Sequence, residues 1–260
     1  MRIDRYAAAA ASLLLALVPT MALPGSTASQ ETPTRLLVRA VANDAKIIGS
    51  GVGGARIVVR NVETGEILAS GVQEGSTGNT QAIVVNPVAR GGKVFDTPGA
   101  GGYTATLQLS EPTQVEVVAE GPLSTDHAIQ KASKTVLMVP GRHLEGEGLI
   151  VVLNGFTVEI QSPESSTAFR GELPVQARVT MLCGCPTEPG GLWDADRIEI
   201  MARLVKDGRV VAEAPLTYAG QTSTYRGTIT SPGGAAVLQV IAVDVGRANT
   251  GMATKALRIR

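Results

Sequence analysis

The stretch Leu173–Cys183, which reads LPVQARVTMLC, decides the fold of this chain. Apolar and polar residues alternate along it, and a period of two is the pattern of a strand that buries one face. The apolar set, predicted to face a core, is Val175, Ala177, Val179 and Met181. The polar set, predicted to face outward, is Gln176, Arg178 and Thr180. We therefore predict a strand that is half-buried in a β-sheet protein.

The same alternation recurs along nearly the whole chain, between Gly, Pro, Asn and Asp residues that favour turns. In the first half the predicted strands are Leu36–Val41, Ala55–Asn61, Ile67–Val72, Gln81–Val85, Tyr103–Leu109, Gln114–Ala119, Thr135–Val139 and Leu149–Leu153. In the second half they are Phe156–Gln161, Leu173–Cys183, Arg197–Val205, Arg209–Thr217, Ser223–Thr230, Val237–Val245 and Ala253–Arg260. By composition Lys46–Gly54 and Arg90–Gly102 are loops, and only Ser124–Ser133 suits a short helix or turn.

The absence of helix-length periodicity after residue 30 excludes α/β barrels and dinucleotide-binding folds. A chain of about 230 residues beyond the N-terminal segment suits two domains of ordinary size. A boundary near Gly155–Pro163 separates them. The fold class is therefore all-β: two antiparallel immunoglobulin-like β-sandwich domains in tandem, over residues 34–154 and 156–260.

The first 28 residues are predicted to be a cleaved signal peptide. Arg2 and Arg5 precede an apolar run of twelve residues, Ala7–Val18, which is too short to span a bilayer. Small residues follow, and cleavage after Ala22 or Ala28 fits them equally well. We therefore expect a periplasmic or secreted protein, and no later stretch is long and apolar enough to give the mature chain a membrane span.

The charge balance argues against one class of function, and the aromatic content restricts which residues can fill the cores. Lys and Arg (23) balance Asp and Glu (23), so the chain lacks the basic excess of a nucleic-acid binder. Aromatic residues make up only 3%, so the cores must be filled by Val, Ile, Leu and Ala.

Two segments of the first half carry a resemblance to a known family. Ala55–Gly78 (ARIVVRNVETGEILASGVQEGSTG) and Ala100–Pro122 (AGGYTATLQLSEPTQVEVVAEGP) resemble the carboxypeptidase regulatory-like, or transthyretin-like, β-sandwich domains. Such domains tend to show a Thr-Gly-Glu turn between two strands and Gly-x-[Phe/Tyr] at the start of a later one. Thr64–Glu66 and Gly102–Tyr103 occupy those places. The resemblance covers residues 34–154 and implies a fold rather than an activity. Residues 156–260 resemble a generic immunoglobulin or fibronectin type III module.

The inventory of reactive residues argues against an enzyme. The two histidines, His127 and His143, lie in predicted loops and are interpreted as exposed or structural residues. Neither a G-x-S-x-G elbow nor an H-E-x-x-H helix is present. Asp194, Asp196 and Glu199 follow no calcium-loop pattern, so we interpret them as solvated carboxylates.

Cys183 and Cys185 form the one unusual constellation. Continuing the strand phase places both on the inward face, beside Met181 and before a Pro/Gly-rich loop that holds the only tryptophan, Trp193. Two thiolates with a thioether as a third ligand suit Cu(I). The alternatives are buried free cysteines, or a disulfide, which needs a bent backbone because residues i and i+2 of a regular strand lie about 6.5–7 Å apart. Trp193 itself could plug the end of the sandwich.

The sequence thus predicts an exported, non-catalytic accessory or binding protein that acts through sandwich loops or edges. The expected partner is another protein or an envelope component, not a nucleic acid, and no cofactor is expected. The alternative is a periplasmic Cu(I)-binding or thiol-redox protein built on Cys183-Gly184-Cys185.

Overall fold

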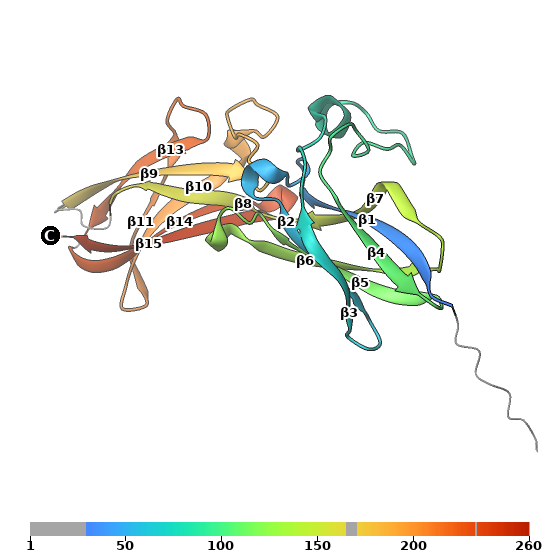
Figure 1. Cartoon of the computed structure of the whole chain (residues 1–260). Helices are drawn as coiled ribbons and strands as arrows, with labels where there is room; N and C mark the ends of the chain where they lie inside the picture. Colours follow the sequence, from blue (N-terminus) through green and yellow to red (C-terminus); the bar gives the residue numbers. More distant parts are fainter. Residues whose placement is uncertain (1–29, 165–170, 232, 260) are drawn as a thin grey trace, which may run out of the picture. The chain divides into compact units, whose positions relative to one another are not determined.

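The computed structural model of the chain describes residues 30–164, 171–231 and 233–259, and residues 31–260 form one compact unit (Figure 1). The predicted signal peptide lies outside the described residues. Within them, no helix is long and apolar enough to cross a membrane. The architecture is all-β, with immunoglobulin-like sandwiches, as predicted.

Residues 32–153 form the first sandwich from two sheets. The three-stranded sheet has the order β4-β1-β7, with β4 Tyr103–Leu109, β1 Thr32–Ala42 and β7 Leu144–Leu153. The four-stranded sheet has the order β3-β2-β5-β6, with β3 Ile67–Gln73, β2 Ala55–Asn61, β5 Thr113–Gly121 and β6 Gln130–Met138.

Residues 156–259 form the second sandwich from two four-stranded sheets. One has the order β12-β13-β9-β8, with β12 Thr217–Tyr218, β13 Thr224–Ser231, β9 Gly171–Met181 and β8 Phe156–Ser162. The other has the order β11-β10-β14-β15, with β11 Arg209–Pro215, β10 Glu199–Lys206, β14 Gly234–Asp244 and β15 Asn249–Ile259. Among the described strands, none of the first sandwich pairs with one of the second. The exact limits of two domains remain a prediction.

The two sandwiches share one sheet order and differ in one strand. In the sheets β3-β2-β5-β6 and β11-β10-β14-β15, strands that correspond in chain order occupy the same positions. In the second sandwich β8 pairs antiparallel with β9, whereas in the first the last strand, β7, pairs parallel with β1. The first sandwich is therefore closed by its first and last strands, a parallel pairing that the antiparallel prediction did not include.

The predicted strand phase of β9 is confirmed on its inward face. Val175, Ala177, Val179 and Met181 are at most 3% exposed, and Arg178 is exposed. Thr180 contradicts the prediction, because its exposed fraction is only 6%. The chain folds back after β9, and Pro186 pairs beside Thr180 in an isolated antiparallel bridge.

The prediction of a strand at Gln81–Val85 is wrong, because these residues form one turn of π-helix. The run is β-branched and apolar, but it stands in a long connection where no strand edge is offered to it. Local bonds decide its conformation instead: the Asn79 side chain accepts from the Ala82 N–H, and the Asn86 N–H donates to the Gln81 carbonyl. The stretch Ser124–Ser133, predicted as a short helix or turn, forms the 3₁₀ turn Asp126–Ala128 and then the start of β6 at Gln130.

The edge strands of β3-β2-β5-β6 and β11-β10-β14-β15 share two features that oppose pairing with another chain. β3 and β11 each contain an extra residue, Leu68 and Val211, that interrupts the ladder. At the opposite edges Lys134 and Lys255 lie on the inward side, and their ammonium groups donate to the carbonyls of Ile150 and Ile160 (3.5 and 3.0 Å). Bulges and inward lysines hinder pairing with another chain, so these four edges are poor templates for strand addition.

Candidate functional site

The two cysteines lie in a hairpin turn, not in the strand itself. β9 ends at Met181, two residues earlier than predicted. The Gly184 N–H donates to the Met181 carbonyl (2.8 Å), and the Met181 N–H donates to the Cys185 carbonyl (3.0 Å). Gly184 has φ +76°, as the last residue of a three-residue hairpin connection often does. The chain reversal, rather than the strand phase, brings Cys183 and Cys185 together.

Cys183 and Cys185 form a disulfide with a Cα–Cα distance of 5.4 Å. Their side chains lie together, as predicted, and the disulfide is one of the alternatives that the sequence left open. Bonded sulfurs cannot act as a pair of thiolate ligands, so a Cu(I) site would need prior reduction. The described residues hold no cluster of three or more His, Cys, Asp or Glu side chains that could bind a metal. The Cu(I) hypothesis for Cys183, Cys185 and Met181 remains a prediction.

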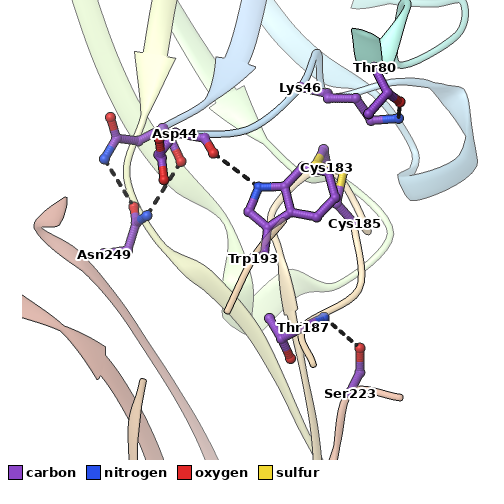
Figure 2. The surroundings of a disulfide bond; sticks show 10 residues. Asp44, Lys46, Thr80, Cys183, Cys185, Thr187, Trp193, Ser223 and Asn249 are labelled. Atoms are coloured by element: carbon purple, nitrogen blue, oxygen red, sulfur yellow. Dashed lines mark hydrogen bonds between the residues drawn. A yellow bond between two sulfur atoms is a disulfide. The ribbon is translucent and has the colours of Figure 1, made fainter. Parts of the chain in front are cut away.

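The cysteine hairpin packs against the first sandwich. A Cβ built on Gly184 would lie 2.9 Å from Cγ1 of Val52, in the short turn between β1 and β2. Beside the disulfide, the Trp193 indole N–H donates to the Asp44 carbonyl (3.0 Å), as Figure 2 shows. Trp193 is only 9% exposed. The disulfide and the tryptophan therefore belong to the join between the two sandwiches.

A polar network continues the join around Asp44. Arg247 contacts the Asp44 carboxylate and pairs with Asp244 at 3.3 Å. Asn249 is fully buried: its side chain accepts from the Gly155 N–H (2.9 Å) and donates to the Asn43 carbonyl (3.3 Å). The cavity beside Trp193 measures only about 20 Å³, enough for about one water molecule. The network thus fixes the join and offers no room for a ligand.

Buried hydrogen bonds hold the loop that carries Trp193. The Thr187 N–H donates to Oγ of Ser223 (3.0 Å, Figure 2), and the Thr187 hydroxyl donates to the Val179 carbonyl (2.7 Å). Tyr225 Oη lies 2.8 Å from the Thr187 hydroxyl, and burial raises the pKa of Tyr225. All these groups are satisfied, which favours a structural role.

We expect Gly184→Ala to destabilise the protein more than Gly190→Ala does. Both glycines have positive φ (+76° and +69°), where a Cβ costs about 1–2 kcal/mol. An added Cβ meets nothing at Gly190 but meets Val52 at Gly184, which adds about 1–3 kcal/mol for overpacking. Urea unfolding of both variants measures the difference. Adding Val52→Ala should recover part of the loss for Gly184→Ala alone, and equal losses for the two glycines would show that the hairpin does not press on Val52.

The other residues singled out from the sequence do not form a site. His127 is exposed, and its Nε2 lies 2.7 Å from the Val158 carbonyl of the second sandwich. His143 Nδ1 accepts from the Arg35 N–H. Asp194 caps a 3₁₀ turn, and the N–H groups of Gly190 and Asp196 hold the pKa of its carboxyl below the usual range. Each therefore has a structural role.

The outward side of the sheet β11-β10-β14-β15, which we call the apolar face, is a feature that the sequence interpretation missed. Cross-strand pairing brings onto it Met201, Val205, Val210, Pro215, Val237, Ile241, Met252 and Ala256. Val210, Met252 and Val237 are 54%, 47% and 37% exposed. One polar row crosses it, and there Arg203 pairs with Glu213 at 2.5 Å. The signal was the segment Val237–Val243 (VLQVIAV), in which both alternate sets are almost wholly apolar.

The outer sides of the other sheets differ from the apolar face. On β12-β13-β9-β8 the outward residues include Glu159, Gln176, Arg178 and Arg226. On β3-β2-β5-β6 charged residues, namely Arg56, Arg60, Glu116, Glu120 and Lys131, separate the exposed apolar side chains of Ile67, Val72 and Leu137. On β4-β1-β7, the segment 94–101 is tied down by Glu147, which accepts from the N–H groups of residues 94–96, and by the buried Arg39. Adjacent apolar rows that are interrupted by a single polar row are typical of an interaction surface.

Comparison with known proteins gives no family. No protein-family model matches the chain, and no curated protein matches it. Among solved structures, the chain is similar to fibronectin(III)-like modules of CbhA from Clostridium thermocellum (12% identity, 85% of this chain and 89% of that chain, TM-score 0.29). It is also similar to titin domains Z1Z2 in complex with telethonin (12% identity, 90% and 98%, TM-score 0.24). TM-scores this low carry no structural argument, so the fold class rests on the strand order and register.

Proposed function

We propose that the protein is an exported, non-catalytic binding module and that it binds another protein on the apolar face. The observation that carries this proposal is the set of apolar cross-strand rows on β11-β10-β14-β15, which include the exposed side chains of Val210, Met252 and Val237. Burying apolar area of this kind is worth about 25 cal/mol per Å². A partner is the simplest physical reason for leaving adjacent apolar rows exposed.

Two further features favour the face over the loops and edges that the sequence suggested. The bulges and inward lysines oppose strand addition at the edges of β3-β2-β5-β6 and β11-β10-β14-β15. The loops that carry Asp44, Trp193 and Arg247 are used in the join. The disulfide supports export, because disulfides persist in oxidising compartments. A periplasmic or secreted location follows from the proposal.

We also propose that the first sandwich is a carboxypeptidase regulatory-like domain. Asn61 accepts from the N–H groups of Glu63 and Thr64 in the predicted turn. The Tyr103 ring lies over Gly71, where a Cβ would come within 2.2 Å of it. Both motifs of the resemblance thus have a structural task, which supports a shared fold without assigning an activity.

Photo-crosslinking tests the binding function. A photoreactive amino acid placed at Met252, on the apolar face, should yield one crosslinked protein in an extract of the cells that make the chain. The same amino acid at Arg178, exposed on the opposite sheet, is the matched control. Mass spectrometry of a product found only with the Met252 variant identifies the partner. Equal products from both positions, or no product from either, would contradict the proposal.

Cu(I) binding is the second candidate, favoured by one observation: the hairpin holds the two sulfurs within bonding distance of each other. Under anaerobic conditions the reduced protein should bind one Cu(I) through Cys183 and Cys185, and replacing either residue by Ser should abolish binding. The oxidised protein is the control and should bind none. Elemental analysis after desalting gives the stoichiometry, and copper-free reduced protein would remove this candidate.

A further inference from the structure

The apolar face has two apolar rows on either side of one polar row, and each row crosses the four strands in the order β11-β10-β14-β15. The polar row is Glu213, Arg203, Gln239 and Thr254. The apolar row nearer the join is Pro215, Met201, Ile241 and Met252. The apolar row at the distal end is Val210, Val205, Val237 and Ala256. A surface that covers the face must therefore match two apolar rows with a polar row between them.

The distal row has a projecting side chain at one edge of the sheet and a hollow toward the other. Val210, on the edge strand β11, is 54% exposed. The hollow has a volume of about 640 Å³, and its lining includes Val237 of β14 and Ala256 of β15 but not Val210. A projection and a hollow in the same row can fit a copy of the same surface, which is what a two-fold symmetric interface requires.

The polar row decides which two-fold axis can bring two such faces together. Two axes place the polar row of one copy on the polar row of the other. An axis along the row would set Arg203 against Arg203 and Glu213 against Glu213, which like-charge repulsion opposes. An axis parallel to the strands, between β10 and β14, exchanges β10 with β14 and β11 with β15. Arg203 then faces the amide of Gln239, and Glu213 faces the hydroxyl of Thr254, so the charged groups meet neutral hydrogen-bonding groups.

The axis parallel to the strands also matches the charges at the distal end. Among the described residues, Arg258 of β15 and Asp207, in the turn between β10 and β11, make no ion pair. The exchange of β15 with β11 brings Arg258 of each copy over the turn that carries Asp207 of the other. Unlike charges placed in this way fix the register of an interface.

We infer that the occupant of the apolar face is a second copy of the chain, in a dimer whose two-fold axis runs parallel to the strands between β10 and β14. The inference rests on the proposed function and names the partner. In this dimer Val210 of each copy enters the hollow beside Ala256 of the other, and Val205 lies against Val237. The strands of the two sheets are aligned, as in other sheets that pack face to face about 10 Å apart.

Analytical ultracentrifugation of the full chain over a range of concentrations tests the dimer. We expect a monomer–dimer equilibrium, and Val237→Asp should raise its dissociation constant by about 100-fold or more, because it sets a carboxylate against Val205 on both sides of the axis. Val152→Asp is the matched control, since it changes a valine of the first sandwich that is 43% exposed. It should leave the dissociation constant unchanged. Urea unfolding checks that both variants are folded.

A short bismaleimide crosslinker tests the axis. Cys183 and Cys185 are joined in a disulfide, so only an introduced cysteine reacts. A mixture of the variants Val210→Cys and Ala256→Cys should give crosslinked dimers, because the exchange of β11 with β15 sets the two positions opposite each other. Val210→Cys alone is the control and should give none, since the two copies of this position lie at opposite edges of the interface.

Three outcomes would overturn the inference: a monomer at every concentration, a dimer that Val237→Asp leaves intact, or crosslinking of Val210→Cys alone that equals that of the mixture. The proposed function fails separately. A different protein captured by the photoreactive amino acid at Met252, with a monomeric chain, keeps the binding function and removes the second copy. A captured product that is a dimer of the chain supports both, and the absence of any product at Met252 removes both.

Discussion

Val179→Asp should unfold the second sandwich. Val179 is fully buried at the centre of β9, between Val158 of β8 and the loop that carries Ser223. An aspartate there buries a charge without a partner and leaves the core underfilled, so we expect a loss of more than about 4 kcal/mol in the free energy of unfolding. Circular dichroism during urea unfolding measures it.

Val210→Asp is the matched control for that substitution. The same change occurs in the same sandwich, but at a side chain that is 54% exposed. Only strand propensity is lost there, about 1 kcal/mol or less. Similar losses at the two positions would mean that the assigned phase of β9 is wrong.

Trp193→Ala should uncouple the two sandwiches. The substitution removes the largest side chain of the join and its hydrogen bond to Asp44, and truncation of a buried tryptophan costs about 3–5 kcal/mol. We expect the unaltered protein to unfold in one calorimetric transition and the variant in two, the first sandwich keeping most of its own stability.

Leu192→Ala provides the comparison, because Leu192 precedes Trp193 and is 52% exposed. It should keep the single transition and lose less than about 1 kcal/mol. Trp193→Phe should fall between the two, since it keeps most of the ring contacts but leaves the Asp44 carbonyl without its donor. A single unshifted transition for Trp193→Ala would show that the join lies elsewhere.

The sequence is informative where a pattern is local. Alternation identifies β9 and its buried set, because a strand that packs on one side imposes a period of two on its own residues. The same rule fails at Gln81–Val85, where apolar β-branched residues have no neighbouring strand to pair with and local hydrogen bonds determine the conformation. It also misses the burial of Thr180, a residue that pairs with Pro186 from beyond the end of the strand.

The candidate sites depend on contacts that no local pattern records. Asp44 and Trp193 are 149 residues apart in sequence, and Val52 and Gly184 meet only after both sandwiches have formed. The sequence correctly predicted that the two cysteines lie close together, but for the wrong reason. A turn, and not a continued strand, brings them together. The apolar face was visible in principle, because Val237–Val243 is apolar on both sides.

The pairing of β7 with β1 has a consequence for how the chain is made. β1 begins at residue 32, and the strand that completes its sheet ends at residue 153, three residues before β8 begins. While the chain is being synthesised, β1 lacks its parallel neighbour until almost the whole first sandwich has emerged, and such non-local pairings form slowly. The first sandwich can then close before the equivalent strands of the second have emerged, which reduces competition between two sheets of the same strand order during assembly.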